Sequence, residues 1–584
     1  MRPLEEVMNY LLFSRTAIKG IQVTILLATV FLNLGYGPIS TVYAAPPSND
    51  NFAAATVIGS IPFTDTVSTI EATQENNEPT VPVACDGRNL DNGVKTVWYR
   101  YTPGVSGLVY ADTFGSDYDN YIAVWRGTTL NNLVFVACDD ESEFDEAQIS
   151  FNVQAGQSYY LQVAGYNGTV QFPDQGNLGG TLNFRVTFPN INVSIGGSLT
   201  ARYYVPGGTG WRASYAGKND GPVELVNVDG LPTIAAERVI YNVNGTPTSF
   251  SEMMGLPASQ LHTTYWMPWY NNVDLDSQLR FGNVSASPAT INVTIGGVPM
   301  PGSPFTLDVG ESTRVSFPGV NGGPVKVESN VNIVAAERVI YYVNGVATSF
   351  SEMMGLPNSQ LTTTYWMPWY NNVDLDTQLR FGNVSATQAT VNVYIAGVPM
   401  TGSPFILPAG QSTRVSFPAI NNGPVQIVSD VPIVASERVI YNINGGPVSF
   451  SEMMGLSDIQ LGIMYWMPWY NNVDLDTQLR FGNVSGLPAT VNVYIGGVLR
   501  TGIPIILQPG QSTRISFPGV NRGPVQIVSD VPIVAAERII YKVNNIPTSF
   551  SEMMGLRNGL LDTRYWMPWY NNVDLDTQLR FGMP

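Results

Sequence analysis

The sequence predicts an all-β protein with one β-sandwich domain followed by four tandem all-β repeats. Hydrophobic residues make up 44% and aromatic residues 11% of the chain, which is enough to fill several cores. The 56 Gly and 41 Pro lie between short runs of Val, Ile, Thr, Tyr and Phe, as is typical of strands joined by tight turns. Long phrases also recur with a period of 100 residues. A chain of 584 residues is too long for one core.

The charge of the chain limits the classes of partner. Charged residues are only 12% of the sequence, and the formal net charge is −17. An acidic surface repels nucleic-acid phosphates and anionic lipids, and no cluster of Lys or Arg offers a local exception. We therefore expect neither a nucleic-acid partner nor a membrane surface as partner.

Residues 1–44 have the pattern of an export signal. Arg15 and Lys19 precede an apolar stretch from Ile21 to Leu34, and small residues stand near Ala44, where a signal peptidase would cleave. An uncleaved anchor helix is the alternative, but the stretch is interrupted by polar residues and is short for a span of about 20 residues. The sequence predicts a secreted, extracellular or cell-surface bacterial protein, with no membrane insertion after cleavage.

The two cysteines, Cys85 and Cys138, both lie in the predicted first domain. In an oxidising compartment one disulfide is the economical interpretation. It would stabilise the fold by about 3–4 kcal/mol through lost entropy of the unfolded chain. Two buried free thiols are the alternative.

The first domain is predicted over residues 46–188. Alternating strand patterns separated by polar turns indicate a sandwich of six or more strands. These patterns cover Thr96–Tyr101, Gly107–Ala111, Tyr121–Trp125, Ile149–Val153, Ser158–Ala164 and Thr181–Phe188.

Several phrases of this domain resemble one known module. They are Asn49-Asp50-Asn51-Phe52, Val97-Trp98-Tyr99-Arg100-Tyr101, Gly115-Ser116-Asp117-Tyr118-Asp119, Cys138-Asp139-Asp140-Glu141 and Ala155-Gly156-Gln157-Ser158-Tyr159-Tyr160-Leu161. In this order and spacing they are similar to the bacterial pre-peptidase C-terminal (PPC) domain. The resemblance covers about a quarter of the chain. It implies a non-catalytic, jelly-roll-like β-sandwich that assists secretion or binds matrix material, and that binds calcium in some members.

The acidic phrases of this domain offer oxygen ligands for a cation. The candidate calcium ligands are Asp117, Asp119, Asp139, Asp140 and Glu141. Carboxylates from several loops would repel one another unless a hard cation such as Ca²⁺ lay between them. The alternative is that these are turn residues that bond their own backbone.

The second part of the chain copies itself four times. Tyr-Trp-Met-Pro-Trp-Tyr-Asn-Asn-Val-Asp-Leu-Asp begins at Tyr265, and Ser-Phe-Ser-Glu-Met-Met-Gly-Leu begins at Ser249, and each returns every 100 residues. A frame that starts at the Ile-Asn-Val strand predicts repeats at 189–284, 285–384, 385–484 and 485–584. The other frame starts each unit at the Tyr-Trp phrase and leaves a partial copy at each end, and strand exchange between neighbours stays open.

Each repeat of about 100 residues, with six or seven strand patterns, has the size of an immunoglobulin-like sandwich. The expected strands of one copy are Thr390–Ile395, Ser412–Phe417, Val425–Val428, Val434–Tyr441, Val448–Phe450 and Gln478–Phe481. The Ser-Glu-Met-Met-Gly segment is expected to form a capped helical turn. Tandem sandwiches of this kind predict a monomeric rod.

The repeated aromatic phrase is the main candidate for ligand binding. A flat platform of rings would stack on sugar faces while the following Asn and Asp bond hydroxyls. The alternative is that the rings fill the core or the joint between successive units. The candidate residues are Tyr265, Trp266, Trp269, Tyr365, Trp366, Trp369, Tyr465, Trp466, Trp469, Tyr565, Trp566 and Trp569.

Catalytic chemistry has few residues to use. The single histidine, His262, is replaced by Thr, Gly and Asp in the other copies, and nothing around it has the spacing of a triad or a zinc site. Asp274 and Asp276 would be alternate residues on an extended chain, which does not favour a paired-carboxylate hydrolase site. The sequence predicts that the protein is not an enzyme.

The favoured function is surface display or adhesion, because identical copies multiply weak contacts. The expected partner is an extracellular polysaccharide or a matrix protein. The first alternative is a polysaccharide-binding protein that uses the aromatic phrase, and the second is an accessory region of a secreted peptidase or hydrolase.

Overall fold

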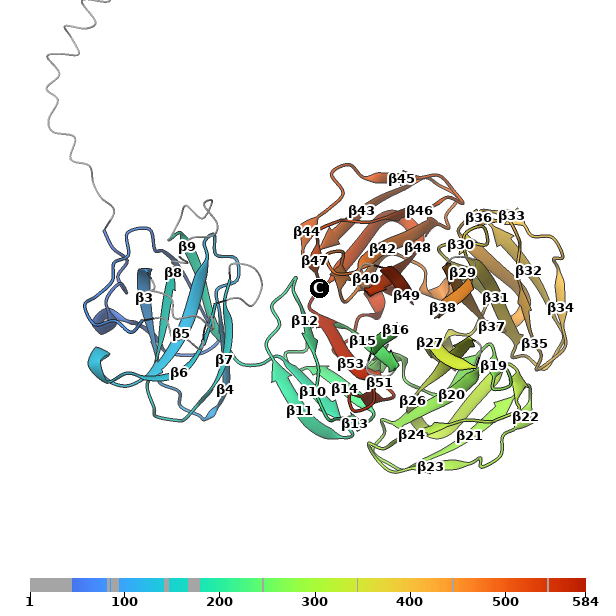
Figure 1. Ribbon diagram of the computed structural model, residues 1–584, viewed down its shortest axis with the longest axis horizontal. Helices are drawn as coiled ribbons and strands as arrows, with labels where there is room; N and C mark the ends of the chain where they lie inside the picture. Colours follow the sequence, from blue (N-terminus) through green and yellow to red (C-terminus); the bar gives the residue numbers. More distant parts are fainter. Residues whose placement is uncertain are drawn as a thin grey trace, which may run out of the picture. The chain divides into compact units, whose positions relative to one another are not determined.

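The computed structural model describes residues 45–80, 85, 94–140, 146–165, 179–243, 246–343, 345–443, 446–543 and 546–584. The chain forms two compact units, Met1–Thr187 and Phe188–Pro584, which meet one residue from the predicted limit at 188 (Figure 1). The predicted signal peptide, residues 1–44, lies outside the described residues. No helix in the described part of the chain is both long and apolar enough to cross a membrane.

Unit 1 is a β-sandwich. Its elements are η1 (Phe52–Ala54), β1 (Thr56–Ile58), β2 (Phe63–Ser68), β3 (Val94–Tyr101), β4 (Gly107–Asp112), β5 (Asn120–Arg126), η2 (Leu130–Asn132), β6 (Val134–Asp139), β7 (Gln148–Val153), β8 (Tyr159–Gly165) and β9 (Thr181–Thr187). One sheet has the order β1-β3-β8-β5-β6 and the other β2-β9-β4-β7. All pairs are antiparallel except β1 with β3.

Period-2 alternation explains the core of unit 1, since successive residues of a strand face opposite sides of the sheet. Val97 and Tyr99 face the second sheet, where Phe184 stacks on Tyr99 with ring centroids 4.1 Å apart. Trp98 faces the other way and packs with Phe52. Cys85 and Cys138 form a disulfide with their Cα atoms 5.2 Å apart.

Unit 2 consists of four groups of strands, and we call each group a ring unit. The first is β10 (Ile191–Ile195), β11 (Ser198–Tyr203), β12 (Gly210–Ala213), β13 (Asn219–Asp220), β14 (Val223–Asn227), β15 (Ile234–Val243), β16 (Thr246–Met254) and β17 (Leu256–Pro257), with β51 (Arg564–Met567), β52 (Tyr570–Asn571) and β53 (Asp576–Gly582). The second is β18 (His262–Met267), β19 (Tyr270–Asn271), β20 (Asp276–Asn283), β21 (Ala289–Ile295), β22 (Val298–Pro299), β23 (Phe305–Leu307), β24 (Ser312–Val315), β25 (Asn321–Gly322), β26 (Val325–Val343), β27 (Val346–Met354) and β28 (Leu356–Pro357).

The other two ring units repeat this series. The third is β29 (Thr362–Met367), β30 (Tyr370–Asn371), β31 (Asp376–Asn383), β32 (Ala389–Ile395), β33 (Val398–Pro399), β34 (Phe405–Leu407), β35 (Ser412–Val415), β36 (Asn421–Asn422), β37 (Val425–Ile443), β38 (Gly446–Met454) and β39 (Leu456–Ser457). The fourth is β40 (Gly462–Met467), β41 (Tyr470–Asn471), β42 (Asp476–Asn483), β43 (Ala489–Ile495), β44 (Val498–Leu499), β45 (Ile505–Leu507), β46 (Ser512–Ile515), β47 (Asn521–Arg522), β48 (Val525–Val543), β49 (Ile546–Met554) and β50 (Leu556–Arg557). A 3-10 turn follows each unit: η3 (Ala258–Gln260), η4 (Asn358–Gln360), η5 (Asp458–Gln460) and η6 (Asn558–Leu560).

One long strand organises the second, third and fourth ring units, whereas the first has two separate strands, β14 and β15, in its place. In the second unit β26 pairs with β21 and β18 through its first half and with β20 and β27 through its second half, so it belongs to two packed layers. The two strands predicted at Val425–Val428 and Val434–Tyr441 are likewise one strand, β37. The all-β fold class with sandwich-like repeats is confirmed.

The ring closes because the end of the chain completes the first ring unit. β53 lies between β12 and β15, and β51 pairs with β14. Figure 1 shows the four units around a common centre, with β16, β27, β38 and β49 nearest to it. Radial repetition of this kind, as in β-propellers, leaves only short, protected sheet edges. The repeats therefore form a closed ring and not the expected rod.

Two other expectations differ from the structure. The sheets do not follow the boundaries at 284, 384 and 484, because β18 and β20 pair with β26 across the first of them. They follow the frame that starts just before the Tyr-Trp phrase. The Ser-Glu-Met-Met segment is a strand, β16, and not a helical turn, because it pairs with β15 and lies beside the equivalent strands of both neighbouring units.

Candidate functional site

The four central strands meet at the ring axis through serine side chains. Ser249, Ser349, Ser449 and Ser549 are buried, and their hydroxyl oxygens form a closed cycle with separations of 3.1–3.2 Å. Two residues farther along, Ser251 Oγ accepts a hydrogen bond from the Glu352 N–H at 2.8 Å, and the other three pairs repeat this contact. A hydroxyl that donates and accepts at once satisfies buried backbone groups. The cycle closes the axis at this level.

A buried ionic cluster lies at each joint between ring units. In the third unit Glu452 accepts hydrogen bonds from Arg380 at 2.8 Å and from Arg438, and Glu337 of the second unit faces both arginines. All four side chains are at least nine-tenths buried. Burial, followed by the nearby Glu452 carboxylate, holds the pKa of Glu337 well above its usual value. Glu237, Glu437 and Glu537 occupy the same position at the other joints, and the pKa of each is raised in the same way.

The tyrosines of the aromatic phrase belong to the core. Tyr265, Tyr365, Tyr465 and Tyr565 are each 0% exposed. The Tyr265 hydroxyl donates to the Ile333 carbonyl at 2.7 Å, so its polar end is also used inside the unit. As ligands for a sugar these four residues were predicted wrongly, because a ring without exposed surface offers no face for stacking.

The tryptophans of the phrase lie at the joints. The guanidinium carbon of Arg480 lies 5.9 Å from the centroid of the Trp369 ring, and that of Arg580 lies 6.0 Å from the centroid of the Trp469 ring. Each pair joins two ring units that are neighbours in the ring. Trp266 packs against the core of the third unit and donates to Asn358 Oδ1 at 2.9 Å. The other tryptophans of the phrase are also buried or half-buried: Trp269, Trp366, Trp466, Trp566 and Trp569. The structure therefore places these tryptophans in the joints between ring units, which was the alternative to a sugar-binding platform.

The same phrase continues into an exposed turn that packing does not explain. Val273, Val373, Val473 and Val573 are 59–60% exposed, and the following Asp is exposed in every copy. Asn271 Oδ1 accepts hydrogen bonds from the Val273 and Asp274 N–H groups at 3.0 and 3.1 Å, which fixes the turn. We call each Val-Asp pair a tip. Four identical, rigid tips lie on the surface of unit 2.

An apolar pocket lies where the four central strands end. It has a volume of about 130 Å³ and is lined by Met254, Gly255, Leu256, Pro257 and Gln260 with most of their equivalents in the other copies. A second cavity of about 140 Å³ lies beside it and shares the four Met254-type side chains. Gln260, Gln360 and Gln460 are partly exposed and lie at the edge of the pocket.

The segment around this pocket differs in every copy. Residues 257–264, 357–364, 457–464 and 557–564, which we call the rim, vary in sequence, whereas the flanking Ser249–Leu256 and Tyr265–Asp276 segments are identical in all four copies. Sequence analysis missed both the rim and the tips. Comparing the four copies position by position, and asking which exposed positions stay identical, would have found them.

Each contact between neighbouring rim segments is also different. Gln360 donates to Gln260 Oε1 at 2.6 Å, and the Thr362 hydroxyl donates to Asp458 at 2.6 Å. Arg557 donates to the Ile459 carbonyl at 3.3 Å, and the Ser259 N–H donates to Asp562 at 2.7 Å. A fourfold scaffold therefore carries an asymmetric rim.

The predicted calcium ligands of unit 1 have structural partners. Asp117 Oδ1 accepts a hydrogen bond from the Thr181 N–H at 2.6 Å, and Asp139 Oδ2 accepts one from the Gln148 N–H at 2.9 Å. Asp119 and Asp140 also have partners, and Glu141 lies outside the described residues. Within the described ranges no three His, Cys, Asp or Glu side chains are grouped so that they could hold a metal ion.

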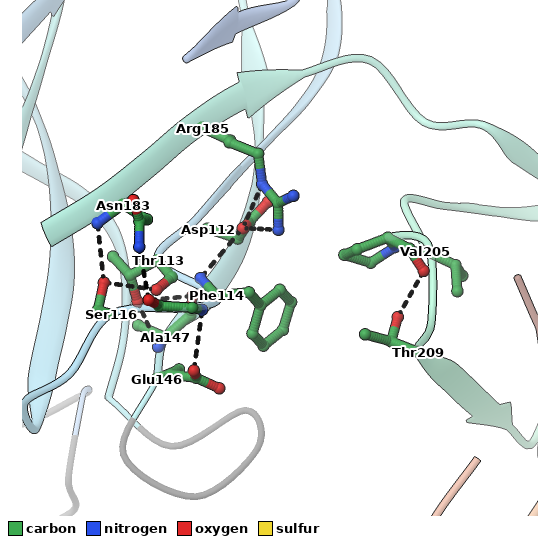
Figure 2. A network of polar contacts seen from close by, with 12 residues as sticks. Asp112, Thr113, Phe114, Ser116, Glu146, Ala147, Asn183, Arg185, Val205 and Thr209 are labelled. Carbon is green, nitrogen blue, oxygen red and sulfur yellow. Dashed lines mark hydrogen bonds and ion pairs between the residues drawn. The ribbon is translucent and has the colours of Figure 1, made fainter. Parts of the chain in front are cut away.

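Ser116, the residue before Asp117, is part of a larger polar network (Figure 2). Ser116 Oγ donates to the Thr113 carbonyl at 2.7 Å and accepts from the Asn183 N–H at 3.0 Å. Nearby, Arg185 forms an ion pair with the buried Asp112 at 2.8 Å. These contacts hold the acidic turn against β9. They agree with the alternative in which the acidic residues serve as turn residues.

His262 takes part in a local contact. Its Nδ1 accepts a hydrogen bond from the Thr264 N–H at 3.0 Å. Asp274 lies within 3.4 Å of the Asn271 side-chain amide, and Asp276 accepts from Gln278 at 3.1 Å. These contacts stabilise the local turn and the strand that follows it.

Comparison with known proteins adds no family. No family model matches the chain, and no curated protein matches it. Among solved structures, an arabinofuranosyltransferase from mycobacteria is 10% identical over 80% of this chain and 42% of its own, with a TM-score of 0.10. A glycosyl hydrolase family 2 member from Bacteroides cellulosilyticus DSM 14838 is 8% identical over 82% of this chain and 94% of its own, with a TM-score of 0.12. The chain spans less than half the length of the mycobacterial protein, and neither likeness carries an argument about this one.

Proposed function

We propose that this protein is a non-catalytic, secreted or cell-surface adhesion protein whose ring presents four identical tips to an extracellular polysaccharide or matrix protein. The observation that carries this proposal is the identity of an exposed, partly apolar turn in all four copies. Buried positions repeat because the same core must be filled four times. An exposed valine has no such reason to repeat.

The chemistry of a tip fits a weak contact with a polymer. Val273 offers a small apolar face, and the Asp274 carboxylate beside it can accept hydrogen bonds from hydroxyl or amide groups. One such contact is weak. Four on one rigid ring raise the effective concentration of each further contact and strengthen attachment by about 10²–10⁴-fold when the spacing of the target matches.

Unit 1 supports the extracellular part of the proposal. Its Cys85–Cys138 disulfide suits an oxidising compartment. Its two-sheet sandwich is compatible with the PPC-like module that the sequence resembles, which would assist export or retain the protein in the matrix.

The test measures retention of the full chain on insoluble cellulose, chitin, peptidoglycan and immobilised collagen. Val→Ser variants carry the change in one tip (Val273), in two tips (Val273 and Val473) or in all four. We expect the native chain to be retained on at least one of these surfaces. Retention should fall stepwise, by more than about tenfold for the four-tip variant.

A matched control is Val309→Ser, because Val309 is 57% exposed but is Ala or Pro in the third and fourth copies. This variant should be retained like the native chain. Equal retention of the four-tip variant and the native chain, or no retention of the native chain on any of the surfaces, would refute the proposal.

A further inference from the structure

We propose that the pocket at the ring axis binds one peptide segment of a partner protein, which inserts a single apolar side chain between the four Met254-type residues and places an acidic residue against Arg557. This site is separate from the tips and does not depend on the function proposed for them.

The size and lining of the pocket define the inserted group. Its walls are thioether and aliphatic groups from four copies of Met-Gly-Leu, and its volume is about 130 Å³. An apolar cavity of about 150 Å³ is large enough to bind benzene. The pocket therefore fits one Leu, Ile, Met or Phe side chain.

The edge of the pocket supplies groups that recognise a peptide backbone. Gln260, Gln360 and Gln460 border the pocket and are partly exposed. A side-chain amide both donates and accepts, as the peptide group does. An apolar floor with a few amides at its edge is the usual pattern of a site that anchors one side chain and orients what is attached to it.

The asymmetry of the rim defines the number of ligands. A ligand on a fourfold axis can be bound in four equivalent orientations if the rim is symmetric. Here Ile459 and Ile463 are 57% and 50% exposed on one side, where the second copy has Ser359 and Thr363. One side of the rim is apolar and the next is charged, so a single orientation is favoured.

The charge of the rim indicates which type of residue stands next to the inserted side chain in the peptide. Arg557 lies beside Ile459, and its guanidinium donates to the Ile459 carbonyl. No carboxylate pairs with Arg557 among the described residues. A rim arginine that no described carboxylate of this chain pairs with can bind a carboxylate of the peptide through two parallel hydrogen bonds.

The test selects ligands from a displayed library of random twelve-residue peptides on the immobilised full chain. We expect the selected peptides to share a Leu, Ile, Met or Phe next to an Asp or Glu. Calorimetry should give one peptide per chain. Replacing the apolar residue of the peptide by Ala should weaken binding by at least about tenfold.

Two protein variants test the rim. Ile459→Ser with Ile463→Thr introduces the residues of the second copy and should weaken binding by at least about tenfold. Arg557→Gln should remove the preference for the acidic residue. Ile406→Thr, an exposed position away from the axis that carries Thr in the second copy, is the control and should bind like the native chain.

Three results would overturn the inference: no selected binder, a stoichiometry of four, or binding that neither rim variant changes. The four-tip Val→Ser variant should still bind the peptide. This separates the two proposals, because loss of adhesion with intact peptide binding, or the reverse, identifies which of them fails.

Discussion

The tips and the rim are both exposed, yet they differ in one respect. The tip sequence is the same in all four copies, whereas the rim sequence is different in each. A surface that repeats can make the same contact four times. A surface that differs around one axis can make only one contact of a given kind, and the two surfaces thus suit a repetitive partner and a single partner.

The identical segments contain a second kind of residue, which repeats because it is buried. The strongest test of this distinction removes a buried carboxylate from a joint. Glu452→Ala leaves Arg380 and Arg438 without their shared acceptor, and we expect the free energy of unfolding to fall by about 3–5 kcal/mol. Urea unfolding of the full chain measures this.

The control is Glu328→Ala, at a position where the other copies have Val. Glu328 pairs with Lys326 at 2.9 Å but is half-exposed, so its loss should cost about 0–1 kcal/mol. Equal effects of the two substitutions would show that the ionic joints do not hold the ring together.

Two adjacent glycines give a finer test. A Cβ at Gly323 would lie 2.5 Å from the Pro268 carbonyl oxygen and 3.1 Å from Trp269 Cα, whereas one at Gly322 would meet nothing within 4 Å. Gly323 is Gly in every copy, and Gly322 is Asp, Asn or Arg in the others. Gly323→Ala should destabilise the chain by about 1–3 kcal/mol through overpacking.

Gly322→Ala should change the free energy of unfolding by less than about 0.5 kcal/mol. Thermal unfolding of the two variants beside the native chain measures the difference. A Gly323 variant as stable as the Gly322 variant would mean that the aromatic phrase can shift away without cost.

The raised pKa of the joint glutamates gives the ring a pH dependence of known sign. Below pH 4.5 the Glu337 carboxyl is protonated in both the folded and the unfolded chain. Above pH 4.5 the unfolded chain releases this proton while the folded chain keeps it. The stability that this group contributes to the folded chain is therefore lost as pH rises. Glu337→Gln keeps a neutral side chain of the same shape. This variant should lose less stability than the native chain between pH 5 and pH 8 in urea unfolding, and identical losses would contradict the assignment.

The smallest effect is expected at the rim. Ile459→Ser with Ile463→Thr removes two exposed apolar side chains, and the second copy already carries these residues on the same scaffold. The free energy of unfolding should change by less than about 0.5 kcal/mol per position. A larger loss in calorimetric scans would mean that the rim is structural.

Local patterns predicted many of the longer strands but not how they meet. Alternation located β3, β5 and β8 within two residues, because one face of each strand is buried. The strand that carries Ser-Glu-Met-Met was predicted only through its first half, as Val448–Phe450 in the third copy, and its second half was predicted as a helical turn. The Glu252 N–H bonds Ser551 Oγ, 299 residues away, and no local pattern indicates such a contact. Ring closure was missed for the same reason, since nothing near Arg580 in the sequence indicates that β53 pairs with β12.

The candidate sites depended on burial, which composition does not provide. The aromatic phrase attracted attention as a sugar platform because Trp and Tyr serve cores and ligands equally well. Only the packed neighbours of Tyr265 and Trp369 separate the two roles. The tip at Val273 was hidden inside the same phrase, where a single valine carries no chemical signal of its own.

Closure of the ring by the end of the chain also sets the order of folding. The Tyr215 N–H bonds the Tyr570 hydroxyl across a separation of 355 residues, and β12, β14 and β15 each wait for a strand from beyond residue 563. During synthesis these strands are open edges that can pair with the wrong chain. Contacts between residues so far apart form slowly, so the first ring unit to be synthesised is the last to be completed. A cell that makes this protein has to protect an unfinished ring until residues 564–582 have been synthesised.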